Sequence, residues 1–159
     1  MLDALKYLKD GISELEVEAF IKKRFIKYGA PILSFSPIVA FGKNTANIHH
    51  VPNKTKLKRG DLVMFDIGTT INHYCSDMTH TYFWGEAPKA KRKKQIEIYN
   101  TVLKAQNLAL NKIKSGERKC AKIDKVARDF IEKHYPDNPA SRRRSSASRG
   151  GFKHGLGHG

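Results

Sequence analysis

Two aspartates lie in apolar segments, where an unpaired carboxylate is costly. Asp66 is part of DLVMFDIG, residues 61–68, and Asp77 is part of CSDMTHTYFW, residues 75–84. An ionised carboxylate can be buried there only beside a cation or several hydrogen-bond donors. A divalent metal ion is one such partner, and a set of lysine, arginine or backbone N–H groups is the other. The residue types alone leave these two interpretations open.

The spacing of the two aspartates suits a metal ion and leaves both interpretations open. Asn72-His73 predicts a two-residue turn between two antiparallel strands. Such a turn pairs Gly68 with Asp77 and places Asp66 two residues along, on the same face. Side chains on one face of adjacent strands lie ~5–8 Å apart at Cβ. Two bare charges at that separation repel each other, whereas a divalent ion is bound well by them.

Histidines near a loop and near the end of the chain add further candidates. His154 and His158 lie in HGLGHG, where glycines on both sides leave the imidazoles accessible. Histidine and carboxylate together form an ordinary ligand set for first-row metals, although a tail with two incidental histidines is the alternative. His49-His50 lies in a loop between two strand signals, a common place for catalytic groups, and two surface histidines are the alternative. The remaining histidines are interpreted as surface or satisfied residues: His73, His80 and His134.

Several helices and strands must position these residues. A capping box at Ser13–Glu16 starts a helix that Gly29 and Pro31 end, and a short helix over 2–9 precedes it. Strands are predicted over 32–41 and 61–67, with 75–84 as the returning strand. Helices are predicted over 89–114 and 121–134. The stretch 136–151, PDNPASRRRSSASRGG, has almost nothing to bury and is predicted to be a flexible basic insertion.

Composition limits the partners. The 159 residues hold 30 Lys and Arg against 15 Asp and Glu, a formal charge of +15. The lysines are spread along the chain, which favours a solvated surface over a nucleic-acid interface. No apolar run approaches the ~20 residues of a membrane span, so no membrane partner is expected. The N-terminal sequence lacks the apolar core of a secretory signal, which predicts a cytoplasmic location.

The order of the motifs resembles one family of enzymes. IVAFGKNTANIHHVP, then LKRGDLVMFDIGTTINHYCSDMTHTYFWG, a long helix and FKHGLGHG resemble the aminopeptidase P and prolidase family, the Xaa-Pro peptidases. The similarity runs from about Ala4 to Lys133 and resumes at Phe152. It implies the α+β pita-bread fold, an antiparallel sheet covered by helices. It also implies a metal-dependent exopeptidase that hydrolyses Xaa-Pro peptide bonds, either as an aminopeptidase or as a dipeptidase.

The resemblance assigns roles to individual residues. Asp66 would bind one metal ion, Asp77 would bridge two, and His158 would bind one. His49 would line the substrate site, and His154 would stabilise developing charge. The implied cofactors are two divalent ions that activate a hydroxide, Mn²⁺ ahead of Co²⁺ or Zn²⁺. The implied partner is a peptide with proline at its second position, and a homodimer is one possible assembly.

The chain also departs from this family. Two further glutamate ligands follow the GHG motif in the family, whereas this sequence ends at Gly159. We therefore expect a partial catalytic domain over 1–159, lacking an N-terminal domain and the C-terminal part of the fold, with little activity on its own. A non-catalytic pita-bread module that binds protein or nucleic acid is one alternative. A methionine aminopeptidase is the other, although CSDMTHTYFWG is more similar to the Xaa-Pro peptidases.

Overall fold

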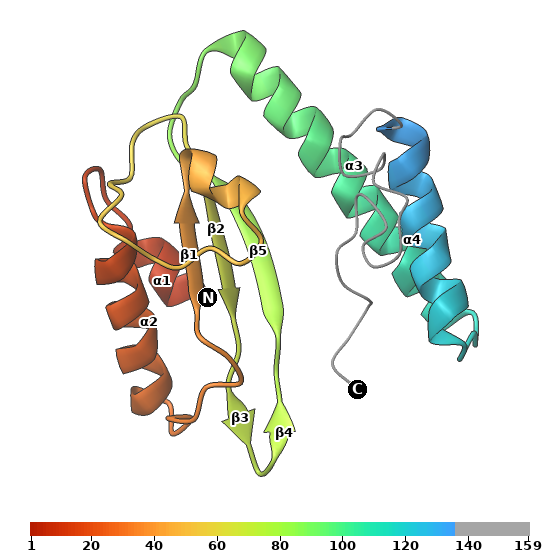
Figure 1. The fold of residues 1–159 in the computed structure, drawn as a ribbon, viewed down its shortest axis with the longest axis horizontal. Helices are drawn as coiled ribbons and strands as arrows, with labels where there is room; N and C mark the ends of the chain where they lie inside the picture. The colour runs from red at the N-terminus through yellow and green to blue at the C-terminus, as the bar shows by residue number, and fades with distance from the viewer. Residues whose placement is uncertain (136–159) are drawn as a thin grey trace. The chain divides into compact units, whose positions relative to one another are not determined.

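The chain forms two compact units in a computed structural model that describes residues 1–135 (Figure 1). The first unit is Met1–Lys89 and the second begins at Ala90. The first contains α1 (Leu2–Tyr7), α2 (Glu14–Lys27), β1 (Ile38–Phe41), the 3₁₀ helix η1 (Gly42–Ala46), β2 (Leu62–Ile67), β3 (Thr70–Ile71), β4 (Tyr74–Cys75) and β5 (Met78–Phe83). The second contains most of α3 (Lys89–Lys114) and all of α4 (Cys120–His134).

Helix α2 begins and ends where the sequence predicts. The Ser13 hydroxyl accepts the Glu16 N–H at 3.3 Å, and the Glu16 carboxylate accepts the Ser13 N–H at 2.8 Å. This reciprocal pair is the capping box. At the other end Gly29 has φ +74°, a left-handed conformation in which a side chain would be strained. The backbone then turns away, and the Ala30 N–H donates to the Phe25 carbonyl at 2.9 Å.

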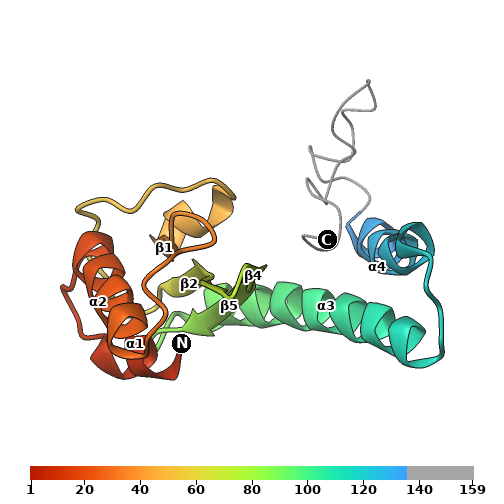
Figure 2. The same ribbon diagram turned by 90° about the horizontal axis from the view of Figure 1, so that it is seen from below.

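Three strands of the first unit form an antiparallel sheet in the order β1-β2-β5, and β3 and β4 form a separate two-stranded sheet. Along β2, burial alternates so that Val63, Phe65 and Ile67 are buried and the residues between them are only half-buried. The buried face packs against α1 and α2, which lie together on one side of the sheet (Figure 2). The core of this unit is made by apolar residues of both layers: Ala4, Leu8, Ile12, Val17, Ile21, Val39, Phe41, Leu57, Val63, Phe65 and Ile67. Each large side chain buried there contributes about 1.5–3 kcal/mol to stability.

The strand predicted over 32–41 is shorter in the structure. Only Ile38–Phe41 forms β1, and before it a single bridge joins Leu33 to Thr69. Pro37, directly before β1, has no N–H to donate to a sheet ladder, which explains why regular pairing starts after it.

The second unit is a helix pair. Helix α3 has the bounds predicted for it, and α4 begins one residue earlier than predicted. Alanines form the α3 side of their contact, where Ala105 and Ala109 pack against Ile123 and Ala127 of α4. The larger apolar side chains of α3 are exposed within this part of the chain, among them Val102 at 52% and Ile113 at 46%. None of the helices formed by residues 1–135 has the length and apolar character needed to cross a membrane.

Candidate metal centre

A two-residue turn fixes the hairpin that carries Asp77. Strands β3 and β4 pair Thr70 with Cys75 and Ile71 with Tyr74, which leaves Asn72 and His73 as the turn. Their φ angles are 49° and 69°, the left-handed values that both central residues of a type I′ turn adopt. Asparagine tolerates this conformation better than most residues, which is the local reason for the turn. The predicted turn is confirmed.

The register of the hairpin brings the two aspartates to one face. In the β2–β5 pairing, Asp66 lies opposite Thr79 and Ile67 lies opposite Met78. The β3–β4 pairs continue this register, so that by count Gly68 lies opposite Asp77. Asp77 is then two residues before Thr79, on the face of Asp66. Diagonal neighbours of this kind are about 7–8 Å apart.

Gly68 permits a close approach of the two strands beside Asp77. A Cβ atom at position 68 would lie 2.0 Å from the carbonyl oxygen of Ser76. The neighbouring Thr69 N–H donates to the Ser76 hydroxyl at 3.0 Å, and the Ser76 N–H donates to the Thr69 carbonyl at 2.8 Å. Because only glycine fits at position 68, this residue keeps Asp77 close to β2.

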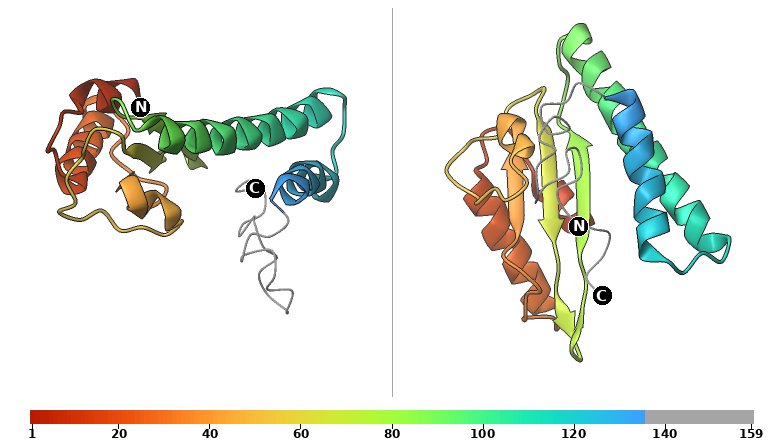
Figure 3. Two further views of the ribbon diagram at one scale, coloured as in Figure 1. Left: turned by 90° about the horizontal axis from the view of Figure 1, so that it is seen from above. Right: turned by 45° about the vertical axis from the view of Figure 1, so that its right-hand side comes forward.

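Asp66 faces away from the helical layer. It alternates with the buried Phe65 and Ile67, and its Oδ1 accepts the Thr79 hydroxyl at 2.8 Å. Helix η1, which leads into the segment of His49, lies on the side of the sheet opposite α1 and α2 (Figure 2 and Figure 3, left). Asp66 is half-buried and Asp77 is exposed. Two such carboxylates on a shared face, one of them supported by a hydroxyl donor, form an oxygen-ligand set that suits a hard divalent cation.

The two adjacent histidines have opposite environments. The His50 side chain is 8% exposed, and its Nε2 lies 2.7 Å from Oε2 of the fully buried Glu14. His49 is exposed, and its backbone N–H donates to the Asn47 side chain at 3.2 Å. His50 is therefore a core residue, and His49 is the histidine of this pair that can meet a substrate. Sequence reasoning missed Glu14, because a glutamate in the first turn of a helix is ordinarily a favourable partner of the helix dipole.

The remaining predicted ligands cannot be placed. His154, His158 and the basic stretch 136–151 lie outside the described residues. Within residues 1–135, no group of three or more His, Cys, Asp and Glu side chains is arranged to hold a metal ion. The described part of the chain thus supplies a pair of carboxylates rather than a full ligand set.

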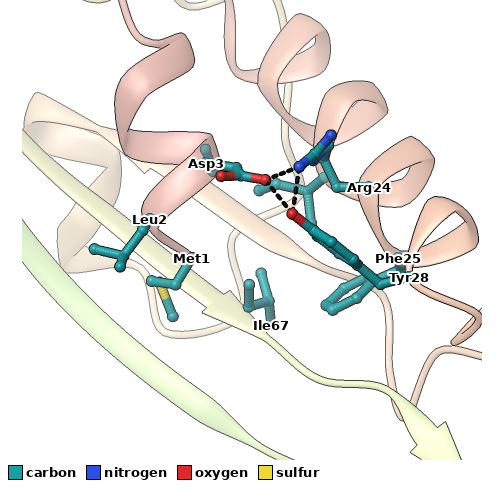
Figure 4. Close-up of a pocket in the computed structure, with 9 residues that line it drawn as sticks. Met1, Leu2, Asp3, Arg24, Phe25, Tyr28 and Ile67 are labelled. Atoms are coloured by element: carbon teal, nitrogen blue, oxygen red, sulfur yellow. Dashed lines mark hydrogen bonds and ion pairs between the residues drawn. The ribbon is translucent and has the colours of Figure 1, made fainter.

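A separate apolar cavity of about 410 Å³ lies between α1, α2 and β2 (Figure 4). It is lined by residues of the helical layer and by Ile67 of the sheet. The polar groups at its rim bond to one another: Arg24 contacts Asp3 and Tyr28, and the Tyr28 hydroxyl donates to Asp3 at 2.8 Å. The Arg24 Nε is buried and has no hydrogen-bond partner among the described residues. These contacts, first from Tyr28 and then from Arg24, lower the pKa of Asp3. Because Ile67 and Asp66 point to opposite faces of β2, the cavity is distinct from the carboxylate pair.

Comparison with known proteins finds peptidases that are similar to this chain. An uncharacterized peptidase of Staphylococcus epidermidis is 40% identical over 154 residues, 96% of this chain and 39% of that protein. The chain thus spans about two-fifths of the length of this relative. The Xaa-Pro dipeptidase of Bacillus anthracis is similar with a TM-score of 0.73 and 34% identity, over 83% of this chain and 36% of that one. The X-Pro aminopeptidase of Thermotoga maritima gives a TM-score of 0.72 and 30% identity, over 84% and 36%.

These matches agree with the α+β pita-bread fold expected from the motifs, represented here by part of its length. The matching family model, metallopeptidase family M24, extends over residues 1–159. The chain belongs to metallopeptidase family M24.

Proposed function

We propose that this chain supplies Asp66, Asp77 and His158 to a dinuclear metal site of an exopeptidase that hydrolyses Xaa-Pro bonds. The observation that supports the proposal best is the placement of Asp66 and Asp77 on one face of paired strands. The similarity to an Xaa-Pro dipeptidase and an X-Pro aminopeptidase supports the choice of substrate. Comparing the hydrolysis of Xaa-Pro dipeptides with that of longer Xaa-Pro peptides distinguishes a dipeptidase from an aminopeptidase.

Each residue would have a distinct role in this reaction. Asp66 would bind one ion, Asp77 would bridge both, and His158 would bind one. When bound, two divalent ions supply Lewis acidity and a water of lowered pKa. His49 would contact the scissile amide, and His154 would stabilise the charge that develops on it. Because carboxylate oxygens suit Mn²⁺, we place it ahead of Co²⁺ and Zn²⁺.

The metal content of the purified chain tests the site. The chain is dialysed against Mn²⁺ and analysed for bound metal, alongside Asp66→Asn and Asp77→Asn. Asp129→Asn makes the same chemical change at an exposed carboxylate of α4 that is paired with Lys125, and serves as the matched control. We expect one or two ions per chain, lost in both site variants and retained in the control. Binding that survives Asp77→Asn, or no binding at all, would contradict the proposed site.

Substrate choice requires a separate assay. The family resemblance places further glutamate ligands beyond the GHG motif. The chain is therefore extended by the corresponding segment of the 40% identical staphylococcal peptidase. Release of the first residue from Xaa-Pro peptides and from Xaa-Pro dipeptides is compared with release of methionine from Met-Ala peptides. Cleavage restricted to the methionine peptides would replace the proposal with a methionine aminopeptidase.

A non-catalytic binding module is the competing proposal, and the charge of +15 favours it. Contacts to nucleic-acid phosphates weaken steeply with salt. Nucleic-acid binding with that salt dependence, together with the absence of bound metal, would support the module. Under the proposal made here, no such binding is expected at physiological salt. A cytoplasmic location and a homodimer stay predictions.

A further inference from the structure

Glu14 is a buried carboxylate that lies outside the proposed metal site. It is the first residue of α2 and has 0% of its side chain exposed. The helix N-terminus favours a negative charge there, but a carboxylate buried this fully also needs direct hydrogen-bond donors.

Among residues 1–135, the hydrogen-bond partners of the Glu14 side chain belong to one segment, residues 41–53. Oε1 accepts the Phe41 N–H at 2.8 Å and the Asn44 side-chain amide at 2.9 Å. Oε2 accepts the Asn53 N–H at 3.1 Å and lies 2.7 Å from Nε2 of His50. An ionised carboxylate only accepts, so a contact of this kind with an ionised Glu14 takes its proton from the His50 Nε2.

These contacts flank His49 on both sides. Asn44 precedes it, His50 follows it directly, and Asn53 follows four residues later. With the His50 ring held in the core, its neighbour His49 is left on the exposed side of the segment. Beyond Asn53 the segment is held to the region before α2, where the Leu57 N–H donates to the Ile12 carbonyl at 2.8 Å.

We propose that Glu14 is a positioning residue: it fixes segment 41–53 and thereby presents His49 on the side of the sheet that carries Asp66. The role of His49 rests on the proposed function, whereas the ordering of the segment does not. Two consequences can therefore be measured independently, one in the chain alone and one in catalysis.

The first experiment follows the segment in the purified 159-residue chain by NMR. Glu14→Gln keeps the size of the side chain but loses the charge, and its amide N–H₂ opposes the His50 Nε2–H. We expect amide hydrogen exchange at 44–53 to rise about tenfold, as for a lost hydrogen bond, with exchange in β2 unchanged. The ¹⁵N chemical shifts of the His50 ring should also show a smaller population of the Nε2–H tautomer. Glu18→Gln, on the same helix and paired with Lys22, is the matched control and should behave as the unaltered chain.

Unchanged exchange at 44–53, or an equal rise throughout the first unit, would overturn the proposal. If Glu14→Gln does not fold, a pair of substitutions at His50 provides the test. His50→Gln keeps an N–H donor for Glu14, whereas His50→Leu removes it. The segment should stay protected in the first and exchange faster in the second, and equal exchange in the two would contradict the proposal.

The second experiment uses the catalytically extended chain. Glu14→Gln should lower kcat/KM by about 10²-fold, as for a misplaced catalytic group, with metal content unchanged. Combining it with His49→Ala should cause no further loss, because both changes remove the same function. Additive losses would show that Glu14 acts elsewhere. If the extended chain binds no metal and hydrolyses no peptide, the proposed function is contradicted. The hydrogen-exchange experiment would still test the role of Glu14.

Discussion

At the scale of single residues, burial distinguishes side chains of the same chemical type. His49 and His50 are adjacent and identical, yet one is exposed and the other is enclosed with Glu14. Asp66 and Glu14 are both carboxylates in the first unit, yet Glu14 is surrounded by four donors and Asp66 lies on an open face with Thr79. The fully enclosed pair is structural, and the accessible groups are the candidates for chemistry.

Truncation of Glu14 should destabilise the first unit. Glu14→Ala removes the acceptor of the buried Phe41 N–H and His50 ring and of the Asn53 N–H, and it leaves the Asn44 amide only its bond to Thr55. We expect a loss of about 3–5 kcal/mol in the free energy of unfolding, measured with urea. Glu18→Ala removes only an i,i+4 pair with Lys22 and should cost no more than about 0.5 kcal/mol. Similar losses in the two variants would contradict the structural role of Glu14.

Glu16 should make stability depend on acid pH. Hydrogen bonds from the Ser13 hydroxyl, the Ser13 N–H and Lys56 lower its pKa from 4.5 to about 2. Because the pKa is lower in the folded chain, this contribution is present above pH 4.5 and is lost as the pH falls towards 2. Urea unfolding between pH 2 and 6 should therefore show a smaller pH dependence in Glu16→Gln. Ser13→Ala removes the main donor and should reduce the same dependence, and an unchanged slope in both would refute this assignment.

At the scale of elements, the β-hairpin determines the geometry of the candidate site. The turn at Asn72-His73 sets the register, and the register decides that Asp77 shares a face with Asp66. A slip of one residue would move Asp77 to the opposite face, because side chains alternate along a strand. The return strand is interrupted at Ser76 and Asp77, between β4 and β5, at the point where Gly68 lets the strands come close.

Substitution of Gly68 should disturb this hairpin. In Gly68→Ala the new Cβ would lie 2.0 Å from the Ser76 carbonyl oxygen, so the backbone must move. We expect a loss of about 1–3 kcal/mol by urea unfolding and faster exchange of the Ser76 N–H. Gly11→Ala is the matched control, because a Cβ there meets nothing within 4 Å and only its φ of +80° is strained. Normal Ser76 exchange in Gly68→Ala would contradict the close approach.

At the scale of the whole molecule, the chain consists of two units with very different cores. The first encloses eleven apolar residues between a sheet and two helices, whereas in the described part of the second, residues 90–135, four buried residues lie between α3 and α4. The carboxylate pair belongs to the better-packed unit. A ligand that binds this unit only when it is folded must stabilise it by mass action.

Metal binding should therefore raise the stability of the chain. At a metal concentration about 100 times Kd, the expected gain is about 2.7 kcal/mol. Calorimetry with Mn²⁺ and then with a chelator measures this gain and its removal. The gain should be absent in Asp77→Asn and present in Asp129→Asn. An equal gain in all three chains would show that the metal binds elsewhere.

Features that depend on neighbouring residues could be predicted from the amino-acid sequence. The capping box of α2, the turn at Asn72-His73 and the strand register next to Asp66 and Asp77 follow from local turn chemistry and the two-residue period of a strand. The bounds of α3 follow from its helical apolar spacing and from the glycine after its end. The burial of His50 and the hydrogen bonds between Glu14 and the segment of His49 became apparent from the three-dimensional structure. The partners of Glu14 are 27 to 39 residues away along the chain, and no local pattern encodes such contacts. They form because the packing of α2 against β1 brings a buried carboxylate to donors that must be satisfied.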